Sequence, residues 1–275
     1  MSDPRHSWAF RPRFRANAFG WKASKLASQR LKEALVEIKA VARKDPPTAA
    51  DGAILLMEKL WPAVQHIDSS SGALGNAVSK TVHGLIEVVL AAPAGDALWE
   101  RWLTRLWTAF EEDGVDFLWE VNERWGELCR TPERASRAAD ELLPLVKASW
   151  QERFGYFRGT QACLDCLRAA GRYDELLALI DAAPVLSWRH RRFGVRALAE
   201  QGRTDEAIAY AQASLGLNDS PSDIAGTCEA ILLDAGRSDE AYERFALEAN
   251  RAGTYLAICR SLIKKYPDRA PRAIL

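Results

Sequence analysis

A five-residue phrase recurs three times in the second half of the chain, and it constrains the fold more than any other feature. The copies begin at Gly171, Gly202 and Gly236, 31 and then 34 residues apart, and each reads Gly-Arg, one variable residue, Asp-Glu. Each copy lies between two amphipathic stretches, so its glycine should end one helix and its acidic pair should begin the next. Recurrence at this period is typical of a helical-repeat solenoid.

The phrase indicates where the helices of this half should lie. We expect three helix pairs, then one unpaired helix and the opening of another. The pairs are 156–170 with 173–182, 187–200 with 204–215, and 222–235 with 238–250; the unpaired helix is 254–265, and the opening is 268–275. A solenoid that stops there leaves its last face uncapped, which suggests a truncated chain or a partner that covers this face.

The first half shows no repeat, so its helices are predicted from apolar periodicity and helix-breaking residues. A helix that begins near Gly20 should end at Pro46. Further helices are expected at 48–67, 73–92, 96–112, 115–129 and 133–149. No segment alternates with the two-residue period of a strand. The sequence therefore predicts an all-α protein, a right-handed α-solenoid of antiparallel helix pairs.

We expect three regions: a basic, aromatic arm (1–18), an N-terminal helical domain (19–150) and the repeats (151–275). The 37 basic and 37 acidic side chains cancel, so no overall field should steer the protein toward nucleic acid or a membrane. Residues 1–45 nevertheless carry 11 Lys or Arg against 4 Asp or Glu, and residues 91–145 carry 6 against 12. These opposite charges indicate either complementary docking surfaces or two solvated faces.

Five cysteines are scattered along the sequence without the spacing of a disulfide-stapled secreted domain. Arginines and prolines interrupt the first residues, so there is no apolar signal core, and no apolar run is long enough to span a bilayer. We therefore expect a soluble, cytoplasmic protein. Cys163 and Cys166 have the spacing of half a zinc site or a redox pair, but they continue an apolar helical stripe and are interpreted as core residues. No metal or cofactor is expected.

Part of the second half resembles a tetratricopeptide repeat. In residues 201–218 the resemblance is carried by the inter-helix Gly202, the small Ala207 and a trailing Leu-x-Leu-Asn, and residues 236–247 and 171–180 share parts of it. It covers about 120 residues and implies divergent repeats.

Three positions depart from the tetratricopeptide pattern. Leu176 replaces the small residue of the first copy, and Val195 and Glu229 stand where the family prefers Gly or Ala. Solenoids of this kind line their concave groove with the first helix of each pair.

The sequence as a whole also resembles an uncharacterised bacterial domain family. The segments that carry this resemblance are Ser7-Trp8-Ala9-Phe10, Val41-Ala42-Arg43-Lys44-Asp45-Pro46, His66-Ile67-Asp68-Ser69-Ser70-Ser71-Gly72 and Trp125-Gly126-Glu127-Leu128-Cys129. The resemblance implies a bacterial helical-repeat protein of unknown role, in a family whose members continue past the end of this sequence. No activity or catalytic residue comes with it.

The first helices of the pairs carry the candidate partner-binding residues. These residues are Arg158, Arg189, Arg192, Phe193 and Arg196, and the four arginines would give a basic groove. Arginine binds carboxylates and phosphates through two-pronged hydrogen bonds, so an acidic or extended segment, or the free C-terminus of a partner, is the natural ligand. Alternatively, these arginines pair with Asp and Glu of neighbouring helices. The principal hypothesis is a non-enzymatic protein–protein interaction scaffold.

The arm carries a rival site in which cations alternate with rings. Its residues are Trp8, Phe10, Arg11, Arg13, Phe14 and Arg15, preceded by Arg5. Such mixtures stack bases and neutralise phosphates, so an alternative function is a nucleic-acid accessory protein. The rings could instead pin the arm onto the helices, in which case the arm is a packing element.

No motif indicates a reaction, and an enzyme with an unrecognised site is the second alternative. His66 precedes Asp68 and the serines at 69–71, but a catalytic triad is recognised by geometry rather than by sequence proximity. The same serines suit a turn and a helix cap. His190 is flanked by three arginines, Arg189, Arg191 and Arg192, and has no companion at metal-ligand spacing, so we expect it at the surface.

Overall fold

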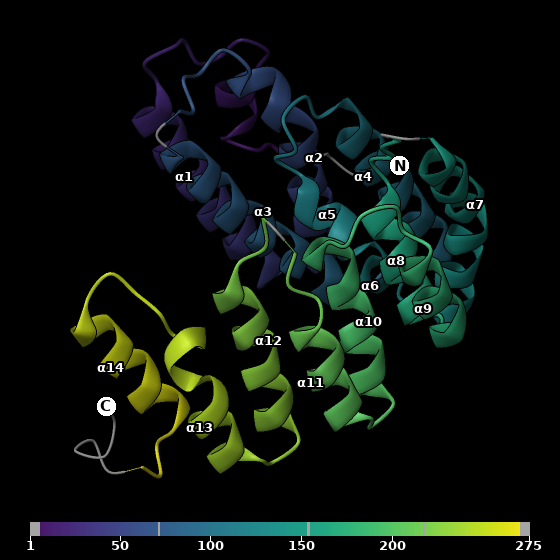
Figure 1. Cartoon of the computed structure of the whole chain (residues 1–275). Helices are drawn as coiled ribbons and strands as arrows, with labels where there is room; N and C mark the ends of the chain where they lie inside the picture. The colour runs from purple at the N-terminus through teal and green to yellow at the C-terminus, as the bar shows by residue number, and fades with distance from the viewer. Residues whose placement is uncertain (1–5, 71, 153–154, 217, 270–275) are drawn as a thin grey trace. The chain divides into compact units, whose positions relative to one another are not determined.

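The computed structural model describes residues 6–70, 72–152, 155–216 and 218–269. These residues contain helices and no strand, which confirms the all-α prediction (Figure 1). The first elements are η1 (Arg11–Phe14), α1 (Ser24–Ala42), α2 (Pro46–Val64), α3 (Ala73–Ala91), α4 (Asp96–Glu112), α5 (Trp119–Glu123) and α6 (Trp125–Leu128). They are followed by α7 (Pro132–Gln151), α8 (Thr160–Ala169), α9 (Tyr173–Asp181), α10 (Trp188–Glu200), α11 (Thr204–Gln212), α12 (Pro221–Asp234), α13 (Ser238–Ala249) and α14 (Tyr255–Lys265).

The protein divides into two compact units, Met1–Cys129 (unit 1) and Arg130–Leu275 (unit 2). We expected the division at residue 150, but α7 belongs to unit 2. It packs against α8, and the Arg172 guanidinium binds Asp140 of α7 at 2.6 Å. These contacts tie α7 to the helices that follow it.

Unit 1 is built around α2. Asp45 caps this helix by accepting a hydrogen bond from the Thr48 N–H at 3.1 Å, and prolines occupy its first two positions. The helix packs against α1, α3 and α4. Ten of its 19 residues are buried, and a helix that is apolar over most of its circumference belongs in a core.

The single helix expected at 115–129 is wrong, because this stretch forms the two short helices α5 and α6. Residues 114–118 stay outside the helix because of Asp113, whose side chain is 1% exposed. Its carboxylate accepts hydrogen bonds from the N–H groups of Val115 and Leu118, at 3.3 and 2.7 Å. An Asp side chain that binds nearby backbone N–H groups favours a turn over a helix.

Unit 2 repeats one turn three times. Gly171, Gly202 and Gly236 have φ angles of +71°, +73° and +73°, a left-handed conformation that glycine adopts without the steric cost of a Cβ atom. In each copy the glycine N–H binds the carbonyl three residues back and the following arginine N–H binds the carbonyl five residues back. This is the Schellman helix ending, and it confirms that the phrase ends one helix before the next begins.

The helices around these turns lie close to their predicted positions and pack on their neighbours in sequence. The pairs α8 with α9, α10 with α11, and α12 with α13 are in contact, and α9 and α11 also contact the helix that follows them. Figure 1 shows α10 to α13 lying side by side in sequence order. The opening helix expected at 268–275 falls mostly outside the described residues.

Candidate functional site

Arginine–aspartate ion pairs involve residues of the repeated turns, and sequence analysis did not foresee them. Arg237 binds Asp205 of the preceding phrase at 2.7 Å. Arg269, which follows α14, binds Asp239 of the third phrase at 2.6 Å. Arg172 of the first phrase binds Asp140 of α7. The signal was present in the sequence, because the phrase repeats its arginine and aspartate together with its glycine.

The glutamate of each phrase binds the arginine of the same phrase. These pairs are Arg172 with Glu175, Arg203 with Glu206 and Arg237 with Glu240, each at 2.6 Å. The arginine and the glutamate of each phrase are therefore engaged within the protein, and the Arg237–Asp205 pair joins the second turn to the third.

The predicted partner-binding arginines of α10 occupy successive turns of this helix. Arg189 and Arg196 are exposed, and Arg192 between them is half-buried. Residues spaced by three and four lie on one face of a helix, so the three guanidinium groups share a face. Arg158 is half-buried and lies two residues before α8 begins.

Phe193 does not contribute to the exposed surface, because its side chain is completely buried. The guanidinium carbons of Arg192 and Arg196 lie 5.3 and 5.9 Å from the centre of its ring. Cations at this distance from an aromatic face are attracted to it. Phe193 thus supports two of the arginines from below, and a partner cannot reach it.

The environment of Arg192 disfavours its positive charge. Burial lowers the pKa of Arg192 to about 10, and the nearby Arg196 acts in the same direction, while Asp223 of α12 opposes them. Each of the four predicted arginines also interacts with other parts of the protein. A guanidinium has five N–H donors, so one interaction leaves others for a ligand.

Arg191 of the same helix serves packing. It donates a hydrogen bond to Ser214 Oγ at 2.8 Å, and its guanidinium carbon lies 4.0 Å from the centre of the Tyr210 ring. Arg191 therefore ties α10 to α11, and it is not part of the arginine face.

The expectation that His190 lies at the surface was wrong. Its ring is half-buried with its centre 5.7 Å from that of Trp150, and its Nδ1 has no hydrogen-bond partner among the described residues. Burial, and secondly Arg189, lowers the pKa of His190 to about 4, whereas Asp219 acts in the opposite direction. The imidazole is therefore neutral near pH 7.

The rings of the arm belong to the core of unit 1. The exposed fractions of Trp8, Phe10 and Phe14 are 6, 2 and 1%. Their ring centres follow one another at 5.3 and 6.5 Å. Rings buried in this way offer no face on which a base could stack, and they pin the arm to the helices.

The cations of the arm stay at the surface. Arg11, Arg13 and Arg15 are exposed, and Arg13 pairs with Glu33 of α1 at 2.8 Å. Arg5 lies outside the described residues. Of the mixed cationic and aromatic site, only the cations are thus accessible.

The other candidate sites have structural roles. Cys163 and Cys166 are completely buried in α8, and burial raises the pKa of the Cys163 thiol to about 12. The Asp68 carboxylate accepts a hydrogen bond from the Ser70 N–H at 3.0 Å, as a turn requires, while Ser71 lies outside the described residues. In the described ranges, no group of three or more His, Cys, Asp or Glu side chains could hold a metal ion.

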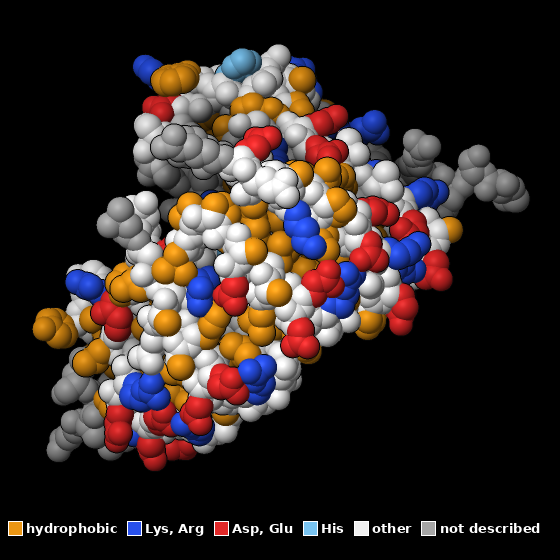
Figure 2. All heavy atoms as spheres, turned by 45° about the vertical axis from the view of Figure 1, so that its right-hand side comes forward, with side chains coloured by type: hydrophobic (Ala, Val, Ile, Leu, Met, Phe, Trp, Pro, Cys, Tyr) orange, Lys and Arg blue, Asp and Glu red, His pale blue; other side chains and the backbone are white. Residues whose placement is uncertain are grey.

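Acidic and basic side chains are interspersed on the face of the molecule in Figure 2. No helix within the described ranges has both the length and the apolar character needed to cross a membrane. No protein-family model matches the sequence, and no match was found among curated proteins or solved structures.

Proposed function

We propose that unit 2 is a tetratricopeptide-like, right-handed α-solenoid of antiparallel helix pairs. Two features support this architecture: the same glycine turn occurs three times, and each helix from α8 to α12 contacts the next. Repeats that contact only their neighbours are typical of solenoids.

The solenoid serves as a non-enzymatic scaffold that binds another protein. The partner contributes an extended acidic segment or its own C-terminus, and it binds Arg189, Arg192 and Arg196 of α10, with Arg158 as a further contact. The observation that carries this proposal is the set of three guanidinium groups on successive turns of one helix. A row of carboxylates along an extended segment complements such a row of cations.

The environment of Arg192 favours an anionic ligand. Burial and Arg196 together destabilise its positive charge, and a carboxylate placed between the two guanidinium groups would relieve their repulsion. Phe193, beneath them, limits how far these two side chains can move, so part of their entropy is lost before the partner arrives.

A charge reversal at the two exposed arginines tests the proposal. The probe is a short fluorescein-labelled peptide rich in Asp and Glu, and its anisotropy is measured with wild-type protein and with the Arg189→Glu/Arg196→Glu variant. The variant should bind at least about tenfold more weakly, because two attractive contacts become repulsive. The affinity of the wild type should fall as salt rises.

The matched control is Arg251→Glu/Arg260→Glu, which changes the charge of unit 2 by the same amount at two exposed arginines elsewhere. This control should bind like the wild type. Equal weakening by both double variants would mean that the peptide responds to net charge alone, and the α10 face would then be rejected as the site.

A further inference from the structure

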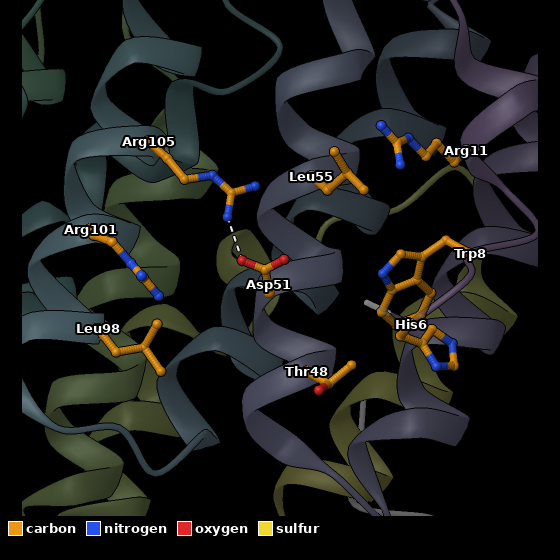
Figure 3. Close-up of a pocket in the computed structure, with 9 residues that line it drawn as sticks. All are labelled: His6, Trp8, Arg11, Thr48, Asp51, Leu55, Leu98, Arg101 and Arg105. Atoms are coloured by element: carbon orange, nitrogen blue, oxygen red, sulfur yellow. Dashed lines mark hydrogen bonds and ion pairs between the residues drawn. The ribbon is translucent and has the colours of Figure 1, made fainter. Parts of the chain in front are cut away.

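Unit 1 contains a pocket of about 630 Å³ that is independent of the α10 face. Its floor is one face of α2, with Asp51 and Leu55. One wall is formed by Leu98, Arg101 and Arg105 of α4, and the N-terminal arm forms the opposite wall (Figure 3). A volume in this range suits a small molecule.

The arm wall is fixed in place. Trp8 lies so close to α2 that a Cβ atom at Gly52 would be 2.1 Å from its ring. The N–H groups of Ala9 and Phe10 donate to the two carboxylate oxygens of Glu37, at 2.7 and 3.1 Å. The pocket is therefore formed before any ligand arrives, which reduces the entropy cost of binding.

The three arginines of the pocket differ in their surroundings. Arg105 is held by Glu58 at 2.6 Å and by Asp51 at 2.5 Å, so its charge is balanced within the protein. The side chains of Arg11 and Arg101 make no hydrogen bond or ion pair to the residues that the structure describes. Two cations thus line the pocket from opposite walls without an acidic partner in the described ranges.

Between these two cations the surface is partly apolar. Leu55 on the floor and Leu98 on the α4 wall are both half-buried, and each contributes to the lining. Figure 3 shows Leu55 lying between the arm and α4. A ligand with one anionic group at each end would place its middle over this apolar surface.

We propose that this pocket binds a small organic dianion, with one anionic group on Arg11 and the other on Arg101 and a neutral or apolar middle on Leu55. Carboxylate and phosphate both fit a guanidinium through two parallel hydrogen bonds. The ligand class is therefore a dicarboxylate or a bisphosphate, and the two are separated by experiment.

Isothermal titration calorimetry of the 275-residue protein at low salt tests the proposal with four probes. The two-ended probes are suberate, a dicarboxylate with an apolar middle, and fructose 1,6-bisphosphate. The single-ended probes are octanoate and inorganic phosphate. At least one two-ended probe should bind about tenfold or more tightly than its single-ended counterpart, because only it reaches both arginines. Whichever pair shows the difference identifies the anionic group.

Substitutions then assign the two ends. Arg11→Gln and Arg101→Gln should each weaken the two-ended probe to about the affinity of the single-ended one, while leaving the helical content unchanged because both side chains are exposed. Arg15→Gln removes an exposed arm cation outside the pocket and should have no effect. No binding of either two-ended probe at about 1 mM, or binding that survives both Arg11→Gln and Arg101→Gln, overturns the proposal.

Discussion

The two units use helices in different ways. In unit 1, α1, α2 and α3 are each 19 residues long and all three contact one another. In unit 2, the helices from α8 to α14 have 9 to 14 residues; each helix from α8 to α12 contacts the next in sequence, and α8 also contacts α10. Unit 1 therefore has one shared core, whereas unit 2 is held together by a series of local contacts.

This difference affects how a local defect should spread. A change in a shared core weakens every helix that contributes to it, because the core packs as one body. In a row of neighbouring contacts, the same change should weaken the adjacent helices and leave distant ones protected. Substitutions in each unit, followed by hydrogen exchange, test this contrast.

The largest effect is expected from Glu229→Ala in unit 2. The Glu229 side chain is 1% exposed and accepts hydrogen bonds from Asn250 and the Tyr266 hydroxyl at 2.7 and 2.8 Å, and it also pairs with Lys265. Its loss leaves buried donors unpaired and should destabilise the protein by about 3–5 kcal/mol in urea denaturation.

Hydrogen exchange of the same variant tests the local nature of unit 2. Protection should fall in α12, α13 and α14 and should stay near the wild-type level in α8 and α9. Glu229→Gln, which keeps an acceptor for Tyr266, should cost less. A uniform loss of protection throughout unit 2 would contradict the contrast between the units.

A pH-dependent effect is expected at His190. Because its folded pKa is about 4 and its ordinary value is 6.5, the unfolded state binds more protons between these pH values, and stability falls as pH falls through this window. One pKa unit corresponds to about 1.4 kcal/mol, so the loss by pH 4 is on the order of 3 kcal/mol.

Urea denaturation of wild type and His190→Gln at pH 8, 6.5, 5 and about 4 measures this effect. The variant lacks the titrating group, so its free energy of unfolding should fall less on acidification. The value at pH 8, where the imidazole is neutral, serves as the reference for each protein. Identical pH profiles of the two proteins would show that His190 does not cause the loss of stability at low pH.

A matched pair of tryptophans tests unit 1. Trp99 and Trp102 of α4 are both 1% exposed, but only Trp99 Nε1 has an acceptor in the described part of the protein, the Leu128 carbonyl at 2.8 Å. Trp99→Phe leaves this carbonyl unpaired and should cost about 1–3 kcal/mol more than Trp102→Phe.

Hydrogen exchange of Trp99→Phe shows how far a defect extends in unit 1, as the Glu229→Ala experiment does in unit 2. Because unit 1 shares one core, hydrogen-exchange protection should fall in α1, α2 and α3 as well as in α4 and α6. If the loss is confined to α4 and α6, unit 1 behaves like unit 2 and the contrast fails.

The smallest effects are expected at two glycines of unit 2. Gly202→Ala forces alanine into a left-handed conformation and should destabilise the protein by about 1–2 kcal/mol. Gly226→Ala lies within α12, where an added Cβ atom meets nothing within 4 Å, and should stabilise it by up to about 1 kcal/mol. Thermal denaturation that shows both changes with the same sign would contradict the assigned role of the repeated turn.

The repeated phrase explains why the helices of unit 2 were predictable. The helices predicted at 173–182 and 238–250 begin at the observed first residues of α9 and α13, Tyr173 and Ser238, because each start depends on a glycine turn whose signal is local. In unit 1 the stretch 115–129 was mispredicted in part because its helix starts late, and this late start depends on a buried Asp113 whose hydrogen bonds only the folded protein reveals.

Which candidate side chains are accessible depends on their burial in the folded protein, and sequence spacing does not reveal burial. The spacing placed Arg189, Arg192 and Arg196 on one helical face, but it could not show that Phe193 lies beneath Arg192 and Arg196. In the same way, nothing local indicated that Glu229 anchors the ends of α13 and α14 through Asn250 and Tyr266. The pocket of unit 1 brings together residues from three separate segments, so only the fold could reveal it.

The most direct test of the α10 proposal is a reversal of charge preference. Fluorescence anisotropy compares an acidic peptide with a Lys-rich peptide of equal length, for wild type and for Arg189→Glu/Arg196→Glu. The wild type should bind the acidic peptide more tightly, and the variant should prefer the Lys-rich peptide, because the charges of the face are inverted. If the variant keeps the wild-type preference for the acidic peptide, α10 does not bind the partner.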